Sequence, residues 1–178
     1  MGLFNFKKKK NKKRREQLCR KADIFIQVHF VRERNMDKNR YNTLSLKSDP
    51  DRDACMEWYE NHGNPETFSE VVLAYLKDKE LNENIVCEKC MLEKSFFSSL
   101  KSDNNYHPSK GEAILIAFAL KLNFEETKAL LKSAEHFFSN SSKSDLIIRF
   151  FIEESIFNLN DLNYVLDKIC DLKIKDII

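Results

Sequence analysis

The chain has 178 residues, enough for one ordinary domain with appendages, and its 42% hydrophobic content is sufficient for a packed core. It contains only three Gly and three Pro, which favours helices and argues against a glycine-rich phosphate-binding loop. The net charge of +2 conceals an asymmetry, because residues 1–66 hold 16 basic and 10 acidic residues whereas residues 67–178 hold 14 and 18. The basic character therefore lies at the front of the chain, and the remainder carries a net charge of −4.

The first segment, residues 1–21, is dominated by positive charge. Eight of the nine positions from 7 to 15 are basic, and such a run repels itself and is usually a disordered or fraying tail. Three roles remain open for it: binding of nucleic acid, association with an anionic membrane surface through Leu3, Phe4 and Phe6, or simple solubilisation. The basic residues concerned are Lys7, Lys8, Lys9, Lys10, Lys12, Lys13, Arg14 and Arg15.

Residues 22–66 predict a short N-terminal β-hairpin followed by a linker. Apolar residues alternate over 24–31, which is typical of a strand, and residues 41–46 are expected to form its partner. A two-stranded hairpin is marginal alone, so it would have to lean on the helices. Residues 47–65 are rich in Asp, Asn, Gly and Pro, with one short helix expected near 54–60.

Residues 67–178 predict a helical domain with clear boundaries. Thr67 and Glu70 form a capping-box pattern, and apolar spacing with capping residues predicts seven helices. The helix over 110–120 is nearly continuously apolar from 113, so we expect it to be buried at the centre. Either Ser142 or Ser144 starts the sixth helix, and Asn160 is expected to cap the last. The other expected ranges are 68–79, 83–90, 94–101, 124–136, about 143–154 and 161–170.

Two short helices joined by a three-residue turn, with one helix before and two after, resemble the helix-turn-helix domain of Cro and lambda repressor. The fold expected is thus mainly α, with a helix-turn-helix-like five-helix core and two extra C-terminal helices. The chain also resembles a family of small helix-turn-helix-like domains of low-GC bacteria, often fused behind macro or von Willebrand A domains. The motifs that carry this resemblance are Phe68-Ser69-Glu70, Phe97-Ser98-Ser99-Leu100-Lys101-Ser102, Tyr106-His107-Pro108-Ser109-Lys110, 117–134 and 145–156.

The resemblance implies DNA reading by the third helix of this domain, 94–101. Its early polar side chains would meet base edges while its neighbours hold phosphates. The expected contacts are Lys94, Ser95, Ser98, Ser99 and Lys101, then Asn104 and Asn105 in the loop, and Lys110 at a helix N-terminus. Members of the family often carry a basic residue in the middle of this helix, where Ser98 and Ser99 stand here. Together with Glu88, Glu93 and the acidic domain, this departure weakens the case for DNA.

No residues converge on a catalytic centre, a metal site or a cofactor site. Cys87 and Cys90 form one CxxC inside a predicted helix, where they are expected to pack as small apolar groups. Neither a signal peptide nor an integral membrane segment is expected, and five irregularly spaced Cys suggest a cytoplasmic protein with reduced thiols. Two functions remain: a transcriptional-regulator-like protein that binds double-stranded DNA as a homodimer, or a non-enzymatic adaptor that docks a protein partner while its basic tail contacts nucleic acid or a membrane surface.

Overall fold

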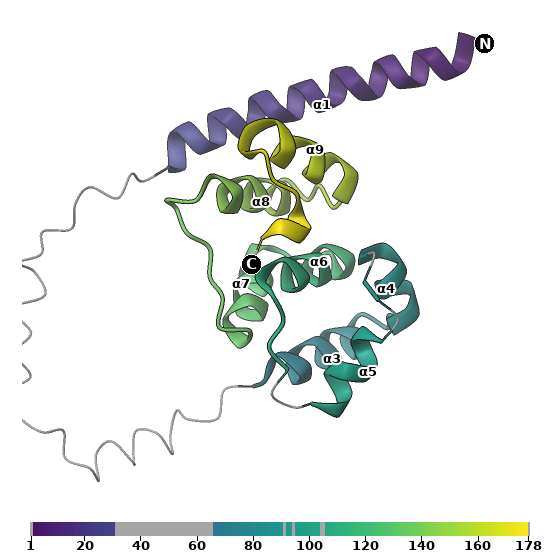
Figure 1. Ribbon diagram of the computed structural model, residues 1–178, viewed down its shortest axis with the longest axis vertical. Helices are drawn as coiled ribbons and strands as arrows, with labels where there is room; N and C mark the ends of the chain where they lie inside the picture. The colour runs from purple at the N-terminus through teal and green to yellow at the C-terminus, as the bar shows by residue number, and fades with distance from the viewer. Residues whose placement is uncertain (1, 31–65, 91, 94, 104–105, 178) are drawn as a thin grey trace, which may run out of the picture.

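The computed structural model describes residues 2–30, 66–90, 92–93, 95–103 and 106–177 (Figure 1). Within these ranges every regular element is a helix, which confirms the mainly-α prediction. The elements are α1 (Gly2–His29), α3 (Phe68–Asp78), α4 (Glu83–Cys90), α5 (Phe96–Ser102), α6 (Lys110–Leu120), α7 (Phe124–Ser133), α8 (Lys143–Glu153), α9 (Leu159–Cys170) and the 3₁₀ turn η2 (Ile174–Asp176).

Capping residues set the starts of α3, α6 and α7 as the sequence predicts. The Thr67 side chain accepts a hydrogen bond from the Glu70 amide while the Glu70 carboxylate accepts one from the Thr67 amide. Reciprocal boxes of the same kind begin α6 at Ser109 and α7 at Asn123, and each cap is worth about 1 kcal/mol. The prediction for α9 was wrong by two residues, because its N-cap is Asn158 and not Asn160.

The buried centre is α6, as its nearly continuous apolar sequence predicts. Every residue from Ala113 to Leu120 is buried, because α4 packs on one flank of the helix and α7 on another (Figure 1). Around it, α3 packs on α7, and α8 packs on both α7 and α9. A helix covered on all sides cannot face DNA or a partner, so the candidate surfaces lie on the elements around it.

The C-terminus closes over the start of α6 at Gly111. The Gly111 amide donates a hydrogen bond to the carbonyl oxygen of Ile177 (3.0 Å). A Cβ on Gly111 would lie only 2.6 Å from the carbonyl oxygen of Ile174 and 2.9 Å from that of Ile177. This close approach of two backbones explains why one of only three glycines in the chain stands here.

The N-terminal region is where the structure differs most from the sequence predictions. Residues 2–29 form one helix, so the strand expected from residue 24 is wrong as far as His29, and a single element crosses the boundary expected at 21/22. The same apolar residues fit two periods: Ile24, Ile26 and Val28 alternate, but Leu18, Ala22 and Ile26 also recur every four positions. The second set is buried, so packing selected the helix. The second strand and the linker of residues 47–65 lie outside the described residues.

Candidate nucleic-acid interface

The C-terminal half of α1 is fixed to the domain. Leu18, Ala22 and Ile26 are buried against α8 and α9, on which α1 packs (Figure 1). The Phe25 ring lies 5.7 Å from that of Phe150, and the Arg149 guanidinium lies 5.6 Å from the Phe25 ring centroid. One face of this half of the helix is therefore part of the core.

Two arginines extend that attachment toward the basic run. Arg14 and Arg15 both pair with the carboxylate of Asp161, Arg15 at 2.9 Å from Nε to Oδ1. Asp161 is 4% exposed and lies in the first turn of α9, where a negative charge is also stabilised by the helix dipole. The Arg15 guanidinium stacks 5.3 Å above the ring of Tyr164. These contacts show that the basic run is helical and held at its C-terminal end, where the sequence predicted a fraying tail.

The remaining described lysines of the run project into solvent. Lys9, Lys10, Lys12 and Lys13 are all exposed, and they form no ion pair with another described residue. In Figure 1 this half of α1 extends beyond α8 and α9, away from the rest of the domain. For Lys7 and Lys8 the structure describes only the helical backbone. We call residues 2–13 of α1 the basic arm.

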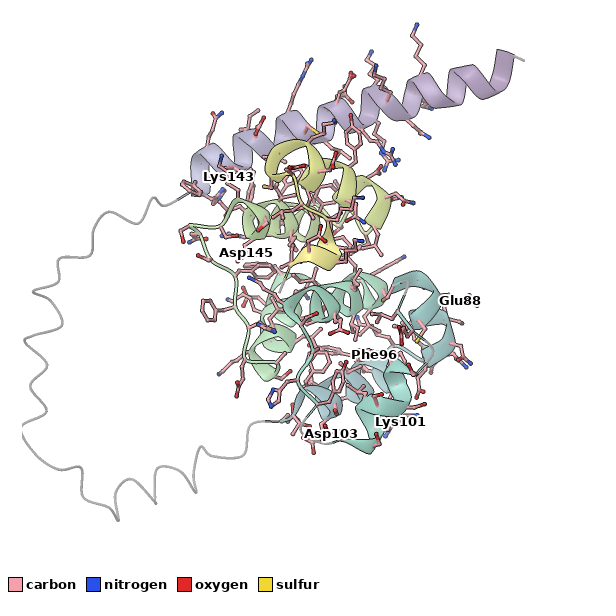
Figure 2. The ribbon with its side chains drawn as sticks, in the orientation of Figure 1. Glu88, Phe96, Lys101, Asp103, Lys143 and Asp145 are labelled. Carbon is pink, nitrogen blue, oxygen red and sulfur yellow. The ribbon has the colours of Figure 1, made fainter. Side chains whose placement is uncertain are left out.

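The face of α5 offers polar groups but little positive charge. Ser95, Ser98 and Ser99 are exposed, as expected for a reading face. The Lys101 ammonium group, however, lies 2.5 Å from Oε1 of Glu83, with which it forms an ion pair. Two further carboxylates, Glu88 on α4 and Asp103 at the end of α5, are exposed (Figure 2). Lys94, Asn104 and Asn105 lie outside the described residues.

Lys110 occupies a different environment from the one expected. Its Nζ lies 2.7 Å and 2.6 Å from the two carboxylate oxygens of Asp145, and the Lys110 side chain is only 13% exposed. Asp145, 3% exposed, also accepts a hydrogen bond from the Ser139 amide at 2.7 Å. The pair joins α6 to α8, so this ammonium group is neutralised inside the protein. Sequence reasoning had assigned no role to Asp145.

The two candidate surfaces lie at opposite ends of the molecule, with α1 at one end and α5 at the other (Figure 1). The basic arm therefore does not border the face of α5, and it cannot supply the positive charge that this face lacks. Of the residues expected to bind DNA, the structure gathers exposed, unpaired cations only in the arm, within the ranges it describes.

The two thiols of α4, Cys87 and Cys90, are buried in the domain. Cys90 is 1% exposed, and its Sγ lies 3.0 Å from the carbonyl oxygen of Leu115. Burial raises the pKa of Cys90 to about 12, and burial together with Glu83 raises the pKa of Cys87. Protonated thiols are poor nucleophiles and poor metal ligands. Among the residues described, no three His, Cys, Asp or Glu side chains come together as a metal-binding group.

In the part of the chain that the structure covers, no helix combines the length and the apolar character needed to cross a membrane. Comparison with protein-family models, with curated proteins and with solved structures found no match in any of the three. The resemblance to helix-turn-helix domains therefore stays a prediction from the sequence motifs, and the candidate site depends on the geometry described above.

Proposed function

We propose that this protein is a cytoplasmic, non-enzymatic DNA-binding protein with a helix-turn-helix-like domain, and that its main contact with duplex phosphates is the basic arm of α1. The observation that carries this proposal is the row of exposed lysines, Lys9, Lys10, Lys12 and Lys13, on a helix whose other half is anchored in the domain. The arm is thus presented in one orientation, which lowers the entropy lost on binding compared with a disordered tail.

Electrostatics favour the arm over the face of α5. Most affinity of non-specific DNA binders comes from lysines and arginines that displace counterions from phosphates. The arm supplies such cations without acidic partners among the described residues, whereas Lys101 is paired and Lys110 is buried in a pair. An α-helix also fits the width of the major groove. We infer that the domain holds and orients the arm, while α5 contributes hydrogen bonds at most.

The experiment is a fluorescence-anisotropy titration of the full chain on random-sequence duplex DNA over a range of salt concentrations. The variant Lys9→Gln/Lys10→Gln/Lys12→Gln/Lys13→Gln removes four charges from the arm. If these lysines contact phosphates, the slope of log affinity against log salt becomes shallower by about 3 to 4 and low-salt affinity falls about a hundredfold.

A control variant removes four exposed charges elsewhere: Lys77→Gln/Lys89→Gln/Lys121→Gln/Lys175→Gln. It has the same net charge as the arm variant and should bind nearly as the wild type does. Equal losses in the two variants would mean that only net charge matters. Binding of the arm to anionic phosphatidylserine vesicles with no binding to DNA would refute the nucleic-acid function and support the membrane alternative.

A further inference from the structure

A trough crosses the solvent-facing side of α7. It consists of two adjoining hollows of about 730 Å³ and 570 Å³, which share Ala129 and Lys132 on α7. The larger one is bounded by Phe137 in the loop between α7 and α8 and by Arg149 of α8. The smaller one reaches α3 at Tyr75. The small side chain of Ala129 leaves the middle of the trough open.

The larger hollow has an exposed aromatic wall. Phe137 is 76% exposed, more than any other large apolar residue whose side chain the structure describes. Its backbone is nevertheless held on both sides: the His136 amide donates to the carbonyl oxygen of Leu131 (2.8 Å), and the Ser139 amide donates to Asp145. His136 Nε2 also lies 3.0 Å from the carbonyl oxygen of Pro108. Aromatic side chains are enriched among the residues that contribute most to protein–protein binding, so the held and exposed Phe137 ring is the candidate anchor of this hollow.

The aromatic end of the trough has a net charge of +1, because its lining includes the cations Lys128, Lys132 and Arg149 and the carboxylates Glu125 and Glu135. Arg149 stacks 4.8 Å from the ring centroid of Phe124 and pairs with Glu153, and Lys128 pairs with Glu125. Lys132 forms no ion pair with any described residue, although it lines both hollows. It is therefore the cation available to a carboxylate of the occupant.

The opposite end carries negative charge. Glu66 and Asp78 line the smaller hollow beside Tyr75. Burial, with the carboxylates of Glu126, Asp78 and Glu66, raises the pKa of the Tyr75 hydroxyl. The lining thus changes from aromatic with a net charge of +1 at Phe137 to a net charge of −1 at Tyr75, where Glu66 and Asp78 outnumber the shared Lys132.

We propose that this trough docks a peptide segment of a partner protein that has an aromatic and an acidic side chain at one end and a basic side chain at the other. The change of charge along the trough favours this occupant over nucleic acid, because a uniformly negative strand would bring phosphates beside Glu66 and Asp78. The proposal goes beyond DNA binding and is independent of it, since the trough lies on α7 whereas the basic arm extends past α9 (Figure 1).

The probe is a random-peptide phage library selected on the full chain, followed by anisotropy measurements on synthetic forms of the enriched peptides. Enriched peptides should share the charge order described above. Their affinity should fall about thirtyfold with Phe137→Ala and about tenfold with Lys132→Glu. Both side chains lie at the surface, so the variants should keep the helical circular-dichroism signal of the wild type.

Matched controls distinguish docking from general stickiness. Val28→Ala removes a side chain that is 72% exposed on α1, and Lys89→Glu reverses an exposed charge on α4; both should leave peptide affinity unchanged. The proposal is overturned if no peptide is enriched, if enriched peptides lack the charge order, or if they bind the Phe137→Ala variant as tightly as the wild type. Displacement of the peptides by oligothymidylate, or self-association of the chain that Phe137→Ala abolishes, would also overturn it in favour of a nucleic acid or a second copy.

Discussion

The basic arm of α1, for which nucleic-acid binding was one of three open roles, and the face of α5, expected to read DNA, differ in what surrounds their cations. In the arm, the lysines at positions 9, 10, 12 and 13 are exposed and have no acidic partner among the described residues. Near α5, Lys101 is 2.5 Å from Glu83, and Lys110 is enclosed with Asp145. A count of basic residues is therefore a poor guide to a phosphate-binding surface, because a cation already paired in the protein must first lose its partner.

The largest expected difference between the paired lysines near α5 and the exposed lysines of the arm is in their contribution to stability. Lys110→Ala leaves the 3%-exposed carboxylate of Asp145 without its cation, so we expect the free energy of unfolding to fall by about 3 kcal/mol. Lys12→Ala, at an exposed position of the arm, should change it by less than about 0.5 kcal/mol. Chemical denaturation followed by circular dichroism measures both. Equal stability of the two variants would mean that Lys110 is not structural and remains available to phosphate.

Asp161 tests the junction between the anchored and the projecting parts of α1. Asp161→Asn removes the charge that holds Arg14 and Arg15, and because those side chains are 54% and 34% exposed the loss of stability should be only about 1 kcal/mol. The two freed guanidinium groups extend the arm, so duplex affinity at low salt should rise about fivefold with a steeper salt dependence. Denaturation and anisotropy measure the two effects.

Asn163→Asp offers a contrasting change on the same helix. It adds a negative charge on α9, at a residue whose side chain accepts a hydrogen bond from the Ile174 amide and takes no part in the arginine pairs. Affinity should not rise in this variant. A fall in duplex affinity with Asp161→Asn would argue that Arg14 and Arg15 position the arm and that the arm needs this fixed orientation to bind.

The helical domain was predictable because its signals are local. Capping residues such as Thr67, Ser109 and Asn123 satisfy amides within the same turn, and the apolar period of each helix is complete over a few turns. The fold of α1 depends instead on contacts with a distant part of the chain. Asp161, which is 147 residues away from Arg14, stabilises a helix that a run of like charges alone would destabilise.

The candidate site was less predictable for the same reason. The capping position before Lys110 correctly indicates a helix N-terminus, which is where phosphates bind in many proteins. Only the fold reveals that Asp145, 35 residues later, takes the place of such an anion. The exposure of Phe137 could likewise not be predicted, because sequence spacing does not distinguish an aromatic residue in the core from one at its edge.

The smallest expected effect concerns the face of α5 itself. Lys94→Ala/Lys101→Ala should lower duplex affinity less than about threefold, because Lys101 already has Glu83 as its partner. Glu83→Gln offers the converse test: it frees the Lys101 ammonium group and should raise affinity only if α5 contacts phosphate. Anisotropy titrations of these variants and of the arm variant with four lysines replaced compare the contributions of both surfaces to duplex affinity. A loss with the α5 pair as large as that of the arm variant, with a shallower salt slope, would reverse the comparison and make α5 the DNA-reading helix.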